Sequence, residues 1–213
     1  TKWVREDQRL QMFNKKAENN LTNIQEIGPN NVGGRTRSII VDHSNPNRYL
    51  CAGVSGGIWT TENKGQSWDN VDDFQITLSA TSIVQSPFDK DVFYYGTGES
   101  AGNTATLGGI GIFKSSDGAK SFQHLEHTMT TAFSGIWDVE HSKVFDKTVY
   151  VATNAGGLWR STDEGDSFSR VYSTGRPIHE IITYDDTTLM FAVRGSGIHL
   201  LNENTLEVTV LTG

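Results

Sequence analysis

The chain repeats one stretch, Gly57-Ile-Trp-Thr-Thr-Glu-Asn-Lys-Gly-Gln-Ser-Trp68, twice more with the same order of residue types. The later copies are Gly111-Ile-Phe-Lys-Ser-Ser-Asp-Gly-Ala-Lys-Ser-Phe122 and Gly157-Leu-Trp-Arg-Ser-Thr-Asp-Glu-Gly-Asp-Ser-Phe168, and they align without gaps. The copies begin at residues 57, 111 and 157, so they are 54 and 46 residues apart. An eroded fourth copy begins at Gly197 and lacks the turn within the pattern. Self-similarity at such a period is typical of repeat architectures.

The polar middle of each copy predicts a tight turn. A hydroxyl residue and an Asp or Asn two positions later accept backbone N–H groups within such a turn. A glycine supplies the positive φ that the turn needs, and the second copy has its glycine displaced by one position. The aromatic residue that ends each copy anchors the returning strand in the core. The turn residues are Thr61, Asn63, Gly65 and Trp68, then Ser115, Asp117 and Phe122, then Ser161, Asp163, Gly165 and Phe168.

Two short apolar runs precede each turn, so every unit reads as four strands. Four short antiparallel strands at a period of roughly 40–50 residues make one blade of a β-propeller. A β-sandwich of unrelated strands does not explain why three turns share one composition at one position in the unit. We therefore predict an all-β propeller of four-stranded antiparallel blades. The expected blades span about 27–70, 71–124, 125–170 and 171–213.

The segment before the blades predicts a short helix over residues 3–17. Trp3, Leu10 and Ala17 recur every seven residues, and Phe13 falls on the same face. Residues 1–26 are then a helix with its linker. Two interpretations stay open, a helix packed on the side or bottom of the propeller and a helix that docks a partner.

Composition excludes several classes of function. The net charge is −7 and the pI is near 5.3, whereas nucleic-acid binders carry a basic patch. No apolar stretch is long enough to span a bilayer. The single cysteine, Cys51, lies in an apolar run and predicts a buried thiol. The histidines show no metal-ligand spacing, so no metal or cofactor is expected. Calcium binding is left as an alternative at Asp72-Asp73 and Asp185-Asp186, although such acidic pairs are usually solvated turn residues.

The three turns resemble the Asp box, or BNR repeat, with the pattern Ser/Thr-x-Asp-x-Gly-x-Ser/Thr-Trp/Phe. Two further stretches are distinctive, Ile27-Gly-Pro-Asn-Asn-Val-Gly-Gly-Arg-Thr-Arg37 and Tyr95-Gly-Thr-Gly-Glu-Ser100. Together these features are similar to large secreted bacterial propellers of the sortilin-like, BNR-repeat and xyloglucanase-like kinds, some exported by the type IX secretion system. The resemblance implies a secreted or outer-surface protein. It leaves function open, because sialidases, xyloglucanases, sortilins and a photosystem assembly factor all carry Asp boxes.

The resemblance also implies where a ligand would bind. In such propellers the Asp-box turns join the third and fourth strands, and ligand sites lie on the opposite face, on loops joining the second and third strands. Those loops here are 54–56, 98–108, 154–156 and 194–196, and the long second one is where a site is expected. The candidate binding residues are Arg35, Arg37, Glu99, Asn103, Asn154 and Arg194.

Enzyme motifs are largely missing. An Arg-Ile-Pro motif and an arginine triad, which sialidases carry, are not found. The Asp that xyloglucanases carry before a Gly-Gly pair is Ser55 here, and a hydroxyl cannot act as the general base of glycoside hydrolysis. Glu99 is the remaining, weak catalytic candidate, and its nearest possible partners are Asp72 and Asp73.

Three functions follow from these expectations. The leading hypothesis is a non-catalytic module that binds protein or glycan through its loops. The alternatives are a fragment of a glycoside hydrolase and a structural component or cargo of a secretion assembly. The fourth repeat is eroded and the last residues show no closing strand, so we expect the blades to belong to a longer propeller.

Overall fold

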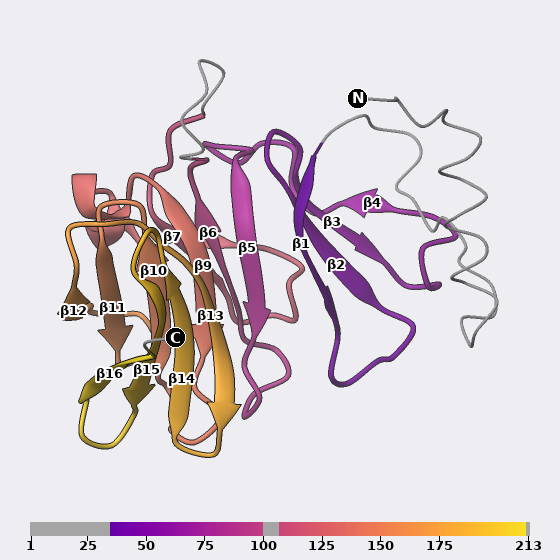
Figure 1. Cartoon of the computed structure of the whole chain (residues 1–213). Helices are drawn as coiled ribbons and strands as arrows, with labels where there is room; N and C mark the ends of the chain where they lie inside the picture. Colours follow the sequence, from indigo (N-terminus) through magenta and orange to yellow (C-terminus); the bar gives the residue numbers. More distant parts are fainter. Residues whose placement is uncertain (1–34, 100–106, 212–213) are drawn as a thin grey trace, which may run out of the picture.

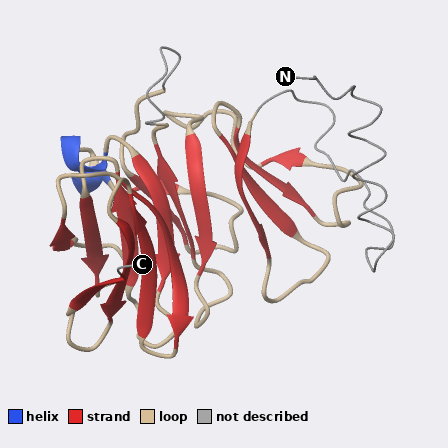
Figure 2. Ribbon diagram, viewed as in Figure 1, coloured by secondary structure: helices blue, strands red, loops and turns tan. Residues whose placement is uncertain are grey.

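The computed structural model describes residues 35–99 and 107–211, whose regular secondary structure is almost entirely β-strand (Figure 2). The helix expected over residues 3–17, its linker and Asn103 lie outside the described residues. The only helical pieces in the described part are two short 3-10 turns, η1 (Glu126–Thr128) and η2 (Thr131–Phe133). The all-β prediction is therefore confirmed for the described part of the chain.

Sixteen strands in the described residues form four sheets, each a four-stranded antiparallel meander in chain order. The first sheet is β1 (Thr36–Val41), β2 (Tyr49–Gly53), β3 (Gly57–Thr61) and β4 (Asp69–Asn70). The second is β5 (Ala80–Gln85), β6 (Phe93–Thr97), β7 (Ile112–Ser115) and β8 (Gln123–His124). The third is β9 (Ile136–His141), β10 (Val149–Thr153), β11 (Gly157–Ser161) and β12 (Ser169–Ser173). The fourth is β13 (Ile178–Asp185), β14 (Thr188–Val193), β15 (Gly197–Asn202) and β16 (Val208–Leu211).

The sheets follow one another around an arc, with the first strand of each on the inside (Figure 1). β1 packs against β5, β5 against β9, and β9 against β13. Alternate side chains of a strand point to opposite faces of its sheet. The second and third sheets each have a neighbour on both sides, so each buries the side chains of one face against the sheet before it and those of the other face against the sheet after it. The three apolar clusters of the core accordingly lie between successive sheets. Phe93, Tyr94 and Tyr150, all fully buried, are among the largest side chains there.

The three repeated turns share one hydrogen-bonding scheme. In the third, the Ser161 hydroxyl donates to Asp163 Oδ1 (2.7 Å) and accepts the backbone N–H of Gly165 (2.8 Å). In each turn, two consecutive residues have a positive φ, namely Lys64-Gly65, Gly118-Ala119 and Glu164-Gly165. The displaced glycine of the second copy thus occupies the other of two left-handed positions, and Ala119 takes the position that glycine fills elsewhere.

The fourth sheet has a closing strand that the sequence analysis did not find. β16 pairs with β15, with Ile198 opposite Leu211. The turn before β16 lacks the repeated signature and is instead organised by Asn202, whose Oδ1 accepts the N–H groups of Asn204 and Thr205. Because this turn uses different residues, the composition of the other three gave no signal for it.

Glycines let the second and third sheets approach closely at β6. A Cβ on Gly96 would lie 2.4 Å from the Ile136 side chain on β9. Gly98 has a φ of +93°, and a Cβ there would lie 2.4 Å from the Ser134 carbonyl oxygen. The glycines of the distinctive stretch at residues 95–100 therefore serve close backbone packing beside the inner strands.

Candidate binding site on the axis

The loops of interest lie together at one end of the sheets. In an antiparallel meander the loop between the second and third strands is at the same end as the start of the first strand. The 54–56, 154–156 and 194–196 loops and the described ends of the 98–108 loop therefore share one face, which we call the loop face. The repeated turns join the third and fourth strands at the opposite end, the turn face (Figure 1).

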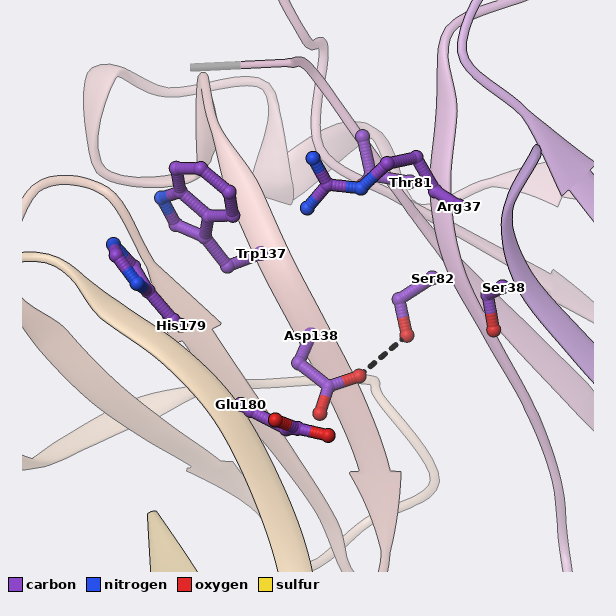
Figure 3. A pocket seen from close by; sticks show the side chains of 8 residues that line it. All are labelled: Arg37, Ser38, Thr81, Ser82, Trp137, Asp138, His179 and Glu180. Carbon is purple, nitrogen blue, oxygen red and sulfur yellow. Dashed lines mark hydrogen bonds between the residues drawn. The ribbon is translucent and has the colours of Figure 1, made fainter. Parts of the chain in front are cut away.

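A pocket of about 420 Å³ lies among the inner strands toward the loop face, and we call it the axial pocket. Two consecutive residues near the start of each inner strand line it (Figure 3). Because the four strands contribute equivalent positions, the pocket is a product of the blade repeat itself. The lining residues are Arg37 and Ser38 on β1, Thr81 and Ser82 on β5, Trp137 and Asp138 on β9, and His179 and Glu180 on β13.

Trp137 lies between a guanidinium group and an imidazole ring (Figure 3). The Arg37 Cζ is 5.0 Å from the centroid of the Trp137 ring, and the His179 ring centroid is 4.4 Å from it. The Trp137 Nε1 donates a hydrogen bond to Asn154 Oδ1 at 3.3 Å. Two residues singled out from the sequence, Arg37 and Asn154, are thus brought together by a tryptophan that the sequence analysis missed.

The pKa of His179 is lowered from its ordinary value, which favours the neutral ring. Burial lowers its pKa most, and the nearby charges of Arg194 and Arg37 lower it further. Its Nε2 is enclosed and has no hydrogen-bond partner in residues 35–99 and 107–211. A buried polar atom without a partner is uncommon in native proteins and calls for an explanation such as an absent ligand.

Asp138 ties three sheets together beneath the pocket. Its Oδ1 accepts the Ser82 hydroxyl at 2.6 Å and the Val139 N–H at 2.9 Å, and its Oδ2 accepts the Ile181 N–H at 2.8 Å. Burial raises the pKa of this carboxyl to about 6, against the effect of the three hydrogen bonds, and the charge of Glu180 adds to the rise. Both oxygens are therefore engaged by the fold rather than available to a ligand.

Glu99, the carboxylate that the sequence favoured for catalysis, is enclosed. Its side chain is 1% exposed, and its Oε2 accepts a hydrogen bond from Arg35 Nη2 at 2.5 Å, whereas the Arg35 side chain is 58% exposed. Neither residue lines the axial pocket. The pair joins the start of the first sheet to the second sheet at the loop face.

The acids considered for calcium have turn roles. Asp72 accepts the N–H of Phe74, and Asp185 accepts the N–H of Thr187. Residues 35–99 and 107–211 contain no group of three or more His, Cys, Asp or Glu side chains arranged to hold a metal ion. Nor does this part contain a helix of the length and apolarity needed to cross a bilayer.

Comparison with known proteins identifies the fold only. No protein-family model matches the sequence, and no curated protein does. Among solved structures, a GH74 enzyme from Niastella koreensis matches with a TM-score of 0.65 at 19% identity, over 83% of this chain and 30% of its own. The extracellular domain of a putative hybrid two-component system from Bacteroides thetaiotaomicron matches with a TM-score of 0.61 at 13% identity, over 85% and 25%.

An auxiliary nutrient binding protein from B. thetaiotaomicron matches with a TM-score of 0.60 at 13% identity, over 83% of this chain and 41% of its own. The fold is a β-propeller. Each four-stranded sheet is accordingly a blade, and the axial pocket lies at the centre of the arc of four blades. The chain spans less than half the length of each of these propellers, and the low identities carry the fold alone.

Proposed function

We propose that this chain is a non-catalytic binding module that recognises a glycan or a protein ligand through its loop face. The observation that carries the proposal is the axial pocket, to which every blade contributes two side chains. Concave sites with a few convergent polar groups are the usual places for ligands, and pockets at the centre of a repeat gather residues from many elements. The proposal places the loop-face candidates Arg35, Glu99, Asn154 and Arg194 around this centre, and Asn103, which lies outside the described residues, stays a candidate from the sequence alone.

The geometry of the carboxylates favours binding over hydrolysis. Glycoside hydrolysis generally needs two carboxyl groups that flank the scissile bond and are free to exchange protons. Asp138 uses both oxygens to join blades, and Glu99 is enclosed against Arg35. Glu180 is the one exposed carboxylate among the residues that line the axial pocket.

The proposal includes a secreted or outer-surface location. Its support is that two of the matching propellers are described as extracellular or nutrient-binding proteins. It also includes membership of the Asp-box class, because the three turns keep that composition and join the third and fourth strands of their blades. A structural component or cargo of a secretion assembly is an alternative to this proposal, and docking of a partner through the N-terminal segment is a further hypothesis from the sequence.

A screen on arrays of glycans and extracellular proteins tests the function. We expect bound spots for the wild-type chain that disappear when Asn154 and Arg194 are both replaced by alanine. The control carries Lys64→Ala and Lys120→Ala on the turn face and should bind as the wild type does. Loss of binding in the control instead of the loop-face variant would contradict the proposal.

The second candidate function is a glycoside hydrolase fragment, and one observation favours it. Asp138, in the pocket beside Glu180, has a pKa raised to about 6, and a raised carboxyl pKa is typical of a general acid. Incubation with oligosaccharides followed by analysis of released sugar separates the two functions. Release that is abolished by Glu180→Gln or by Glu99→Gln would replace binding with catalysis as the function.

A further inference from the structure

Two charged side chains of the axial pocket have no hydrogen-bond or ion-pair partner among the described residues. Arg37 belongs to the first blade and lies over the face of Trp137, Glu180 belongs to the fourth blade, and both side chains are exposed. They lie on different sides of the pocket (Figure 3). The Thr81 and Ser82 hydroxyls, in contrast, donate to backbone or carboxylate oxygens of the propeller itself. A ligand would therefore be recognised mainly by the Arg37 guanidinium and the Glu180 carboxylate.

The Arg37 side of the pocket suits a carboxylate. A guanidinium group offers a planar fork of donors that matches the two oxygens of a carboxylate. Arg194 and Arg37 both lie close enough to His179 to lower its pKa, so positive charge gathers there. His179 lines the same side of the pocket, and its Nε2 has no hydrogen-bond partner among the described residues.

The Glu180 side requires that the ligand also carry hydrogen-bond donors. A simple inorganic anion would face the charges of Glu180 and Asp138, which repel it. A ligand with a carboxylate at one end and hydroxyl groups at the other satisfies both sides, because hydroxyls donate to the Glu180 oxygens. Sugar acids have this distribution of groups.

The aromatic residue of the pocket disfavours a peptide and a neutral sugar. An open apolar surface would favour an apolar peptide side chain or the stacked face of an uncharged sugar ring. Among the described residues that line the pocket, Trp137 is the one large apolar ring, and it lies between Arg37 and His179. Recognition must then come from charge and hydrogen bonds rather than from stacking.

We propose that the axial pocket binds an acidic glycan, with a sugar carboxylate on Arg37 and ring hydroxyls on Glu180. The inference rests on the proposed binding function and names its ligand class. The pocket of about 420 Å³ lies within the range of small-molecule sites, roughly 300–1,000 Å³. A short stretch of an acidic chain can therefore enter, while the rest of the chain lies across the loop face.

Calorimetric titration with oligogalacturonate and with its methyl ester tests the proposal. The two probes share rings and hydroxyls, and the ester replaces each negative carboxylate by an uncharged group with one added methyl, so the acid should bind about tenfold tighter than the ester. Raising the salt from about 50 to about 500 mM should remove most of that difference. Arg37→Gln should weaken binding of the acid about tenfold and leave the ester unchanged, whereas Glu180→Gln should weaken both.

The control is Lys120→Gln, which removes an exposed cation on the turn face and should bind both probes as the wild type does. Thermal melting of every variant checks folding, which we expect to be unchanged because Arg37, Glu180 and Lys120 are exposed. Equal binding of acid and ester, absence of binding by either, or insensitivity of the acid to Arg37→Gln would overturn the inference. Binding of a peptide library through Arg37 would replace the glycan with a peptide.

The same experiments separate failure of the inference from failure of the proposed function. A neutral glycan or a protein that binds in the array screen and is lost with the loop-face variant would leave the function standing without the acidic ligand. An array without any loop-face ligand, together with no binding of either galacturonate probe, would overturn both.

Discussion

At the scale of single residues, the repeated turns are stabilised by hydroxyl and carboxylate oxygens that accept backbone N–H groups. Asp117 shows this most fully, since it accepts the Ser115 and Ser121 hydroxyls and the N–H groups of Lys120 and Ser121. These hydrogen bonds lower its pKa to about 2. A carboxyl group with a lowered pKa stabilises the folded state above its unfolded pKa and loses that effect as the pH falls through the folded value.

Replacement of Asp163 by Asn should cost about 0.5–1 kcal/mol at pH 7. The cost is modest because the first turn already has an asparagine at this position. There the Asn63 Nδ2 donates to the Ser67 hydroxyl, whereas the Asp163 Oδ2 accepts from the Ser167 hydroxyl. The pKa of Asp163 is lowered to about 2, so the difference from wild type should shrink as the pH falls from about 4 toward 2. Urea unfolding at pH 7 and pH 2.5 measures this.

Ser161→Ala in the same turn should cost more, about 1–2 kcal/mol, because the buried N–H of Gly165 loses its acceptor. The turns could be predicted from the sequence for the same reason that these effects are local, since the hydrogen bonds between the hydroxyl, the carboxylate or amide and the turn backbone span at most four residues. The axial pocket could not be predicted in this way. Its lining runs from Arg37 to Glu180, and only the curvature of the arc brings the four inner strands together.

At the scale of the strand, β9 concentrates buried acidity on the axis. Asp138 and Glu140 are two residues apart and share the inner face of the strand. Burial, followed by the charge of Asp138, raises the pKa of Glu140 to about 7, although the Thr183 hydroxyl donates to it at 3.2 Å. Both acids have folded pKa values above their unfolded values, so their contribution to stability is full below about pH 4 and is lost as the pH rises toward 7.

Glu140→Gln should therefore raise the melting temperature at pH 8 and leave it nearly unchanged at pH 4. The amide oxygen of Gln still accepts the Thr183 hydroxyl, and the uncharged group removes a stability loss on the order of 1–2 kcal/mol. Melting curves of both proteins between pH 4 and pH 8 provide the comparison. A variant that melts lower than the wild type at pH 8 would show that the charge of Glu140 stabilises the propeller.

Close packing of β6 against β9 gives a second test at this scale. Gly96→Ala should cost about 1–3 kcal/mol, because its Cβ would lie 2.4 Å from Ile136 and the two blades would have to separate. Gly108→Ala is the matched control, since nothing lies within 4 Å of its Cβ position. Chemical denaturation measures the free energy of unfolding of both variants. Equal values would contradict the prediction, because they would mean that β6 and β9 can accommodate the added methyl group without loss of stability.

At the scale of the whole molecule, the outer edges of the blades differ in how readily they could pair with another chain. β4 and β8 each have two residues and offer little unpaired backbone. β16 has four, carries no charge within Val208–Leu211, and leaves Val210 and Leu211 43% and 48% exposed. The repeat predicted outer strands for the first three blades, but this edge was hidden because no signature turn precedes it.

Val210→Lys should reduce aggregation, because a charge on an exposed edge strand opposes pairing with a second chain. The side chain is partly exposed, so the melting temperature should change little. Light scattering during incubation at a temperature just below melting compares the variant with the wild type. Thr209→Lys on the same strand is a useful companion, and unchanged aggregation in both would place the vulnerable edge elsewhere.

The eight lining positions of the axial pocket, two on the inner strand of each blade, have a consequence for the evolution of this protein. The residues that hold a blade together sit in its signature turn and its apolar face, whereas those that meet a ligand are two adjacent positions at the start of the inner strand. Some of these pairs can vary independently, one blade at a time, without disturbing the turn chemistry. Asp138 is an exception because it also links three blades, and Thr81 and Ser82 are exceptions because their hydroxyls bond the third blade. Diversification of the ligand should therefore proceed through the first and fourth blades, around a second and third that stay fixed.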